Sequence, residues 1–321
     1  KEGYERLKNQ AYEKATNDNY VDAMEIAHFV QGIDLLLGGH IHKGYEKVWE
    51  DPVNHTICMQ NYGNGGNLGW LDLQIHMPSR SIAGYDYPAE GSSLLLLQED
   101  EFWPDTSVAN FIEEQQRKYE KGFKEVIGKT ETALTRSSVG EAPMNNFLAD
   151  VMRQRVDADF AFMNFGGIRS NIRKGPITRE DIFKVLPFGN EIVVFEASGK
   201  LIKVIVEQKL SGSSSGLVIA GGKVVYNREY SDGQRVVYLE IKGESLDPDK
   251  KYRLATNDYL IEGNSGLYML KDIPRSEVDF TGVRLREAVI QYIQENSPVS
   301  AEVDGRWKQD DDAKPSPEWI K

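Results

Sequence analysis

The sequence NFGGIR at residues 164–169 and the sequence PFGN at residues 187–190 are the stretches around which the second half of the chain is organised. Strand-like residues at 159–163 precede the first stretch, so its two glycines let the backbone turn sharply and approach a ligand closely. Arg169 offers a planar fork of N–H donors that suits a carboxylate, a phosphate or a sugar edge. Phe188 lies between a proline and a glycine, where helix packing does not account for a ring. A planar cation and a loop-borne ring together predict a site for a flat polar ligand such as a nucleotide.

Helices and strands alternate around these two stretches, which predicts an α/β domain. Apolar residues recur at i, i+3 and i+4 between positions 144 and 156, and this spacing predicts a helix. Thr178, with Asp181 three residues later, resembles a capping box and predicts a helix that runs to Val185. The other predicted elements are strands at 191–197, 223–227, 235–242 and 252–256, a helix capped by Ser198, a flexible loop at 211–216 and a helix at 283–293.

The first hundred residues predict a second α/β part. A short amphipathic helix is expected at 20–30, and the apolar run at 33–37 predicts a strand buried on both faces. This strand leads into the sequence GGHIH, at the end of a strand where open α/β sheets usually place ligands. Further strands are expected at 56–60 and 68–75, around a loop rich in glycine and asparagine.

The length of 321 residues favours two domains. We expect a first part at 1–98, a linking segment at 99–126 whose charged helix runs over 108–126, a second domain at 127–308 and a loose acidic tail at 309–321. The alternative is that the charged helix covers the surface of one domain. The chain opens at Lys1 without an initiator methionine or a recognisable signal, which suggests a piece of a longer protein.

Composition limits the partners. The 38 basic and 50 acidic residues give a net charge of −12, which argues against sequence-independent binding to a nucleic acid polymer or an anionic membrane. No segment approaches the roughly 20 apolar residues that a membrane helix needs. The single cysteine, Cys58, rules out an internal disulfide. A nucleotide or nucleoside stays possible, because a few local cations can reverse the field within a site.

His40 and His42 are the candidate metal ligands. Neutral imidazole is the commonest metal ligand, and a flanking glycine lets a loop bring it close to an ion. The alternative is a pair of surface histidines in a glycine-rich turn, since a complete metal site needs three or four ligands. His28, His55 and His76 are interpreted as packed or surface residues without a metal.

Five stretches of sequence, in order along the chain, resemble one known family. Residues 33–42 look like the last metal-binding motif of the calcineurin-like metallophosphoesterases, and residues 60–73 resemble the 5′-nucleotidase branch of that family. Residues 164–169, 187–190 and 257–260 resemble the C-terminal nucleotide-binding domain of the same branch. The resemblance implies the C-terminal fragment of an αββα metallophosphoesterase sandwich, joined by a helix to a complete mixed α/β nucleotide-binding domain.

The resemblance also implies a hydrolase with two divalent metal ions, zinc, manganese or similar, that activate water and hold the developing charge. His40 and His42 match ligand positions, one for each ion. The family's other ligands come earlier than Lys1 in the pattern, so we expect an incomplete metal site in this chain, and we assign no catalytic residue.

In the second domain the resemblance assigns Phe188 and Tyr259 to two rings that sandwich a base. Asn164 and Asn190 match polar positions near the base or ribose, and Arg169 matches an arginine at the ribose. The alternatives are core packing for the two rings and a turn-stabilising ion pair for Arg169.

Two positions depart from the family pattern. Ser265 replaces a carboxylate that accepts hydrogen bonds from ribose hydroxyls, which puts sugar recognition in doubt. Ser138 stands where a phosphate-directed arginine is common, three residues before Glu141, and the nearby Arg136 is displaced.

The expected function is therefore phosphoester hydrolysis of nucleotides by a 5′-nucleotidase-like enzyme, with the chain as given inactive alone. The alternatives are a related phosphodiesterase or nucleotide-sugar hydrolase, or a non-catalytic nucleotide-binding module. The resemblance implies a periplasmic, extracellular or cell-surface location. The sequence does not indicate an oligomeric state.

Overall fold

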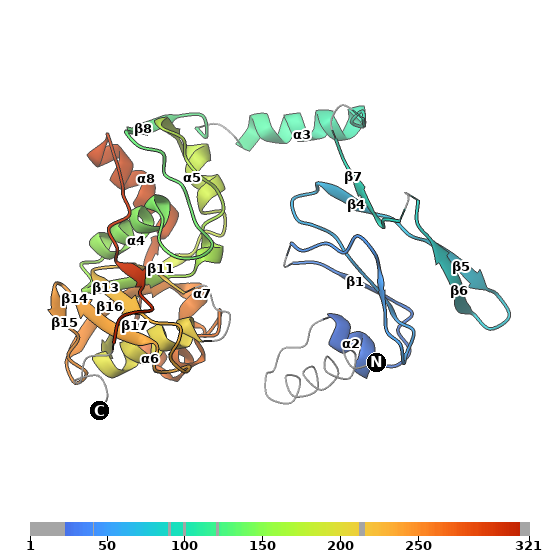
Figure 1. Ribbon diagram of the computed structural model, residues 1–321. Coiled ribbons are helices and arrows are strands. Elements are labelled where there is room, and N and C mark those ends of the chain that lie inside the picture. The colour runs from blue at the N-terminus through green and yellow to red at the C-terminus, as the bar shows by residue number, and fades with distance from the viewer. Residues whose placement is uncertain are drawn as a thin grey trace. The chain divides into compact units, whose positions relative to one another are not determined.

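The computed structural model describes residues 23–40, 42–88, 91–98, 101–119, 122–211 and 216–314. The chain divides into two compact units, and the boundary falls between Glu114 and Gln115. This boundary lies inside helix α3, Thr106–Tyr119, which is the predicted charged helix (Figure 1). The expectation that the helix extends to Val126 is wrong, because Gly122 turns the backbone with a φ of +100° and Val126 already begins strand β8.

The first unit contains one small mixed sheet, in the order β1-β3-β2. β1 and β3 pair in parallel, with Gly38 opposite Gln60. The elements are α2 (Ala23–Phe29), β1 (Leu35–Gly38), β2 (Trp49–Glu50), β3 (Ile57–Gln60), the pair β4 (Asn67–Gly69) and β7 (Leu94–Leu96), and the hairpin β5 (Asp72–His76) and β6 (Ser81–Asp86).

Two expectations for this unit are wrong. The predicted strand at 33–37 is not buried on both faces: β1 is the edge strand of the described sheet, Leu37 is 70% exposed, and β3 is the buried strand instead. The run at 68–75 is two strands rather than one. Trp70 interrupts it by bonding its backbone N–H to the carbonyl of Ser93, so β4 and β5 pair with different partners.

Asp51 organises the turn that joins β2 to β3. It is fully buried, and it accepts hydrogen bonds from the backbone N–H groups of Val53 at 3.0 Å and Asn54 at 2.6 Å. Nδ1 of His28 lies 2.9 Å from its other oxygen. Burial raises the pKa of this carboxyl, but the hydrogen bonds of Asn54, His28 and Val53 together hold the pKa below its ordinary value.

We therefore expect Asp51→Asn to destabilise the first unit at pH 7 by about 2 kcal/mol, the scale of hydrogen bonds to a charged group. Because the folded pKa is depressed, the stabilisation is present above the unfolded pKa of about 3.9 and is lost as the pH falls through the folded pKa. Hydrogen exchange of the α2 and β3 amides, compared between the variant and the unmodified chain from pH 7 downward, measures the difference in stability. Asp86→Asn is the control. The Asp86 carboxylate is exposed and accepts a hydrogen bond from the exposed side chain of Gln74, so the expected change in stability is within about 0.5 kcal/mol. A stability gap that stays constant with pH would contradict the prediction.

The second unit is built on a five-stranded sheet in the order β12-β9-β16-β11-β17. Alternate side chains of β9 enter two separate cores: Phe160 and Phe162 pack on one face, and Ala161 and Met163 on the other. Figure 1 shows α4, α5 and α8 on one side and α6 on the other. Burial on both faces explains why β9 reads as a continuous apolar run.

The helices of this unit are α4 (Pro143–Arg155), α5 (Arg179–Val185), α6 (Gly199–Leu210), α7 (Asp258–Ile261) and α8 (Leu285–Asn296), with short 3-10 turns η1 (Phe165–Gly167), η2 (Tyr268–Asp272) and η3 (Arg275–Glu277). The strands of the main sheet are β9 (Phe160–Met163), β11 (Glu191–Ser198), β12 (Val218–Ala220), β16 (Lys251–Asn257) and β17 (Val278–Arg284). A second sheet contains β13 (Gly222–Tyr226), β14 (Val236–Ile241), β15 (Glu244–Ser245) and β18 (Trp307–Gln309), and β8 (Val126–Thr130) pairs with β10 (Gly175–Thr178).

The predicted capping residues are confirmed in this unit. Thr178 and Asp181 form a reciprocal capping box at the start of α5, and the Ser198 hydroxyl accepts from the backbone of Leu201 at the start of α6. The loop expected at 211–216 lies mostly outside the described residues.

The expectation of a loose tail from residue 309 is wrong as far as Lys314. β18 pairs in parallel with β13, and Trp307 is buried. Asn227 then holds the following residues, because its Nδ2 donates to the carbonyl oxygens of Asp311 at 2.8 Å and Ala313 at 3.2 Å. Residues 315–321 lie outside the described part of the chain.

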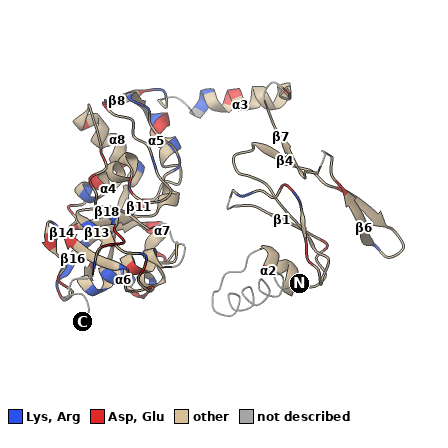
Figure 2. Cartoon of the chain, viewed as in Figure 1, with Lys and Arg blue, Asp and Glu red and all other residues tan. Residues whose placement is uncertain are grey.

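Charges of both signs lie on the same elements, as Figure 2 shows for α3 and α6. None of the described helices has the length and apolar character needed to cross a membrane.

Candidate functional site

The turn after β9 carries Asn164 and Arg169. The backbone N–H of Arg169 donates to the carbonyl of Val185 at 2.9 Å, which fixes this turn against the end of α5. Nη1 of Arg169 lies 3.3 Å from the carbonyl oxygen of Gly166, and its Cζ lies 5.7 Å from the centroid of the Phe188 ring. The guanidinium thus stabilises the turn and also faces the predicted stacking ring. The structure thus brings together residues 164–169 and 187–190.

Phe188 lies on the loop between α5 and β11. Its ring is 60% exposed, which excludes core packing as its role in the described structure. Gly189 follows with a φ of +65°, a backbone conformation that glycine adopts without strain. The loop therefore presents an aromatic ring to solvent.

Tyr259 lies in α7, directly after β16, and is 44% exposed. β11 and β16 are antiparallel neighbours with Ile192 opposite Asn257, so the Phe188 loop and α7 leave the same edge of the sheet. Asp258 connects them: its Oδ1 accepts from Nδ2 of Asn190 at 2.7 Å and from the backbone N–H of Tyr259 at 2.8 Å. One carboxylate therefore positions both ring-bearing segments.

Ser265 lies in a loop held in a left-handed conformation, with φ values of +80° at Gly263, +55° at Ser265 and +78° at Gly266. Lys209 of α6 donates to the carbonyl of Ser265 at 2.9 Å, and burial lowers the pKa of its amine. Nδ2 of Asn264 donates to the carbonyl of Tyr259 at 2.8 Å. The loop that carries Ser265 is thus tied to the helix that carries Tyr259.

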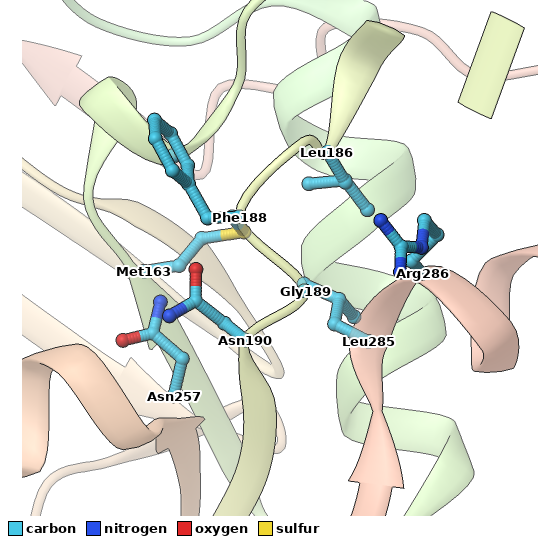
Figure 3. A pocket seen from close by; sticks show the side chains of 9 residues that line it. Met163, Leu186, Phe188, Gly189, Asn190, Asn257, Leu285 and Arg286 are labelled. Carbon is cyan, nitrogen blue, oxygen red and sulfur yellow. The ribbon is translucent and has the colours of Figure 1, made fainter. Parts of the chain in front are cut away.

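A pocket lies beneath the Phe188 loop (Figure 3). Phe188 and Asn190 are predicted site residues that line it. Three further polar or charged groups lie in or near it. Asn164 is a predicted site residue and Asn257 belongs to the stretch 257–260, whereas Arg286 has no sequence signal of its own. Asn257 and Arg286 line it, and the buried Oδ1 of Asn164, which has no hydrogen-bond partner in the described residues, lies near its Gly167 wall. The lining residues are Met163, Gly167, Leu186, Phe188, Gly189, Asn190, Asn257, Leu285 and Arg286.

The carboxylate of Glu141 is engaged in hydrogen bonds within the protein. Its carboxylate accepts from Nδ2 of Asn146 at 2.6 Å and from the backbone N–H groups of Asp304 at 2.7 Å and Gly305 at 3.0 Å. The backbone N–H of Arg136 donates to Oδ1 of Asn171 at 2.7 Å. The contacts of neither residue indicate how the chain compensates for Ser138.

His40 and His42 follow β1 at the carboxyl ends of the parallel pair β1 and β3, and both adopt left-handed backbone conformations, with φ values of 70° and 56°. The His42 ring packs so closely over Gly63 that a Cβ there would lie 2.4 Å from its Cγ. In the described part of the chain, no three His, Cys, Asp or Glu residues gather where they could hold a metal ion. The two histidines alone therefore do not complete a metal centre in the described part of the chain.

The other histidines have protein partners. Nδ1 of His28 lies 2.9 Å from Asp51, Nδ1 of His55 lies 2.9 Å from Glu50, and Nδ1 of His76 lies 2.5 Å from the Ser79 hydroxyl.

Comparison with known proteins identifies the family. The model of the 5′-nucleotidase C-terminal domain matches residues 126–272, which contain every predicted ligand-binding residue. Protein UshA of Yersinia enterocolitica is 29% identical over 84% of this chain and 54% of its own length. Residues 126–272 therefore belong to the family of 5′-nucleotidase C-terminal domains.

Other similarities agree with this membership. The trifunctional nucleotide phosphoesterase protein YfkN of Bacillus subtilis is 32% identical over 89% of this chain and 20% of its own length. The crystal structure of a 5′-nucleotidase precursor from Thermus thermophilus matches 95% of this chain and 67% of that chain, with a TM-score of 0.72 and 23% identity. This match supports the mixed α/β fold expected for a 5′-nucleotidase. The chain spans about a fifth of YfkN and about half of UshA.

Proposed function

We propose that this chain takes part in phosphoester hydrolysis of nucleotides and that its second unit binds the nucleoside. Phe188 and Tyr259 would stack on the two faces of the base. Asn164, Asn190 and Arg169 would contact the base and ribose, and Ser265 would lie near the sugar.

The observation that carries this proposal is the hydrogen-bonded bridge from Asn190 to Asp258 and on to the backbone of Tyr259. It ties together two segments that each present an exposed ring. An exposed ring loses contact with water when a base stacks on it, and such stacking contributes about 1–3 kcal/mol per base. Stacking does not require a particular base, so the two rings support a site for nucleosides in general and do not select one substrate.

The chemical step would need divalent metal ions. His40 and His42 stay predicted ligands of two divalent ions, such as zinc or manganese, and the described residues supply no further ligands. The proposal therefore concerns the role of this chain in recognition. A periplasmic, extracellular or cell-surface location likewise rests on the family resemblance.

A related phosphodiesterase or nucleotide-sugar hydrolase is the second candidate, because Ser265 lacks the carboxylate of the family pattern. Asn264 next to it is neutral and its Nδ2 donates to the Tyr259 carbonyl, so its side chain offers one amide oxygen as an acceptor in place of a charged carboxylate. A sugar held with fewer hydrogen bonds tolerates substituents more readily.

Calorimetric titration of the full chain tests the nucleoside site. Adenosine and AMP are expected to bind, whereas ribose 5-phosphate, which has no base to stack, is expected to bind at least tenfold more weakly. Equal binding of AMP and ribose 5-phosphate would place recognition in the phosphate and contradict the proposal. Failure of both nucleoside ligands to bind would favour a different ligand class.

A further inference from the structure

Arg286 forms one wall of the pocket beneath the Phe188 loop (Figure 3). It lies in the first turn of α8 and is 9% exposed. Its Nη2 lies 3.6 Å from the position that a Cβ would take on Gly189. The guanidinium therefore reaches the loop that carries Phe188 from below.

Protein groups satisfy this cation poorly. Its Cζ lies 3.8 Å from the centroid of the Phe183 ring, which covers one face of the guanidinium. The Oε1 atom of Glu287 lies 3.6 Å from Nε, beyond hydrogen-bond distance. Nε is buried without a hydrogen-bond partner, and none of the described residues accepts a hydrogen bond from this guanidinium.

The position of Arg286 in its helix adds to the cost of burying this cation. The N-terminus of a helix carries a partial positive charge, which disfavours a cation in the first turn. A buried donor that lacks an acceptor, and above all a buried charge, is costly. A ligand oxygen that accepts a hydrogen bond in the pocket would remove this cost.

The rest of the pocket restricts the shape and polarity of that ligand. Met163, Leu186 and Leu285 give it apolar walls, and a base stacked on Phe188 would place only its edge in it. Nδ2 of Asn190 is engaged by Asp258, which leaves the amide oxygen of Asn190 as an acceptor. A base with a carbonyl oxygen beside a ring N–H matches the donors of Arg286 and the acceptor of Asn190.

We propose that Arg286 is a specificity-determining residue that favours bases with a carbonyl oxygen, such as hypoxanthine, over adenine, which has an amino group at the same place. The inference rests on the proposed nucleoside site and goes beyond it by naming the base. Arginine pairs with the carbonyl oxygen and ring nitrogen of a 6-oxopurine in other recognition settings.

Titration of the full chain with inosine and adenosine tests the proposal, because the two nucleosides differ in the group presented to Arg286. Inosine is expected to bind about tenfold to a hundredfold more tightly to the unmodified chain. In Arg286→Met, which keeps an apolar stem and removes the donors, the two affinities are expected to become equal within about threefold. Arg286→Lys keeps the charge without the planar fork and is expected to lose most of the preference.

Arg275→Met is the matched control. Arg275 also stacks on a phenylalanine, with its Cζ 4.6 Å from the Phe280 centroid, and also has a carboxylate, that of Glu262, at 3.6 Å, but it does not line the pocket. It is expected to keep the full preference for inosine. If Arg286→Met fails to fold, the ratio of inosine affinity to adenosine affinity in Arg286→Lys tests the proposal instead.

A preference for inosine that survives both Arg286 substitutions, or an unmodified chain that binds both nucleosides equally, would overturn the proposal. Titration with inorganic phosphate tests whether the acceptor oxygens that Arg286 binds belong to a phosphate and not to a base. Phosphate binding that depends on Arg286 without any base preference would assign the residue to an anion and overturn its role at the base. If neither nucleoside binds the unmodified chain, the proposed function itself fails, and this inference fails with it.

Discussion

Replacing Phe188 and Tyr259 together by alanine is expected to lower the affinity of the chain for adenosine by about thirtyfold or more. Each ring is exposed, so the protein keeps its core when the ring is removed. Stacking contributes about 1–3 kcal/mol per ring, and 1.4 kcal/mol corresponds to a tenfold change in affinity. Each single substitution is therefore expected to weaken binding by about fivefold or more, and calorimetry with adenosine measures all three variants.

A ring outside the site provides the control for this experiment. Phe111 of α3 is 61% exposed, close to the 60% of Phe188, and it belongs to the first unit. Phe111→Ala removes the same side chain from a similarly open position, and the adenosine affinity is expected to stay within twofold. An affinity unchanged in the double variant would show that the two rings do not hold the base, whatever else binds there.

Local sequence signals predict much of the second unit because they act over a few residues. The capping box of Thr178 and Asp181, the helix at 143–155 and the hairpin of β13 and β14 all depend on neighbours in the chain or on regular spacing. The exposure of Phe188 follows from its place between proline and glycine in the same way. Such features need no knowledge of the rest of the fold.

Contacts between distant segments could not be predicted. Arg286 reaches Phe183 and Gly189 from a helix about a hundred residues later in the chain, and nothing in its neighbourhood marks it as buried. Lys209 similarly finds Ser265 across 56 residues. A charged residue in an amphipathic helix is read as solvated, so sequence periodicity hides the cations Arg286 and Lys209.

The first unit shows a different limit. An apolar run predicts that a strand is buried but not by what, and Leu37 in β1 is 70% exposed in the described structure. The sequence places His40 and His42 correctly at the carboxyl ends of parallel strands. The roles of His40 and His42 as metal ligands stay predictions.

Phe160→Ala is expected to destabilise the second unit by about 3–5 kcal/mol, the cost of removing a fully buried phenylalanine from a core. Phe160 is 0% exposed in β9 and packs in the core between the main sheet and α6. β9 leads directly into residues 164–169, so the same strand supports the fold and the site. Hydrogen exchange of β9 and β16 amides measures this loss separately from changes in the first unit.

Phe188→Ala is the counterpart of the same substitution on the surface. It is expected to change the stability of the second unit by less than about 0.5 kcal/mol, as for an exposed side chain, while it weakens adenosine binding. Phe160→Ala, studied under conditions where the unit stays folded, is expected to bind adenosine within about threefold of the unmodified chain. If Phe188→Ala destabilised the unit as much as Phe160→Ala does, the exposed ring would be part of the fold, and its assignment to recognition would be wrong. If Phe160→Ala lowers only the stability and Phe188→Ala lowers only the adenosine affinity, then the residues that stabilise the sheet are distinct from those that bind the ligand. Both groups nevertheless lie within one strand and the loops at its end.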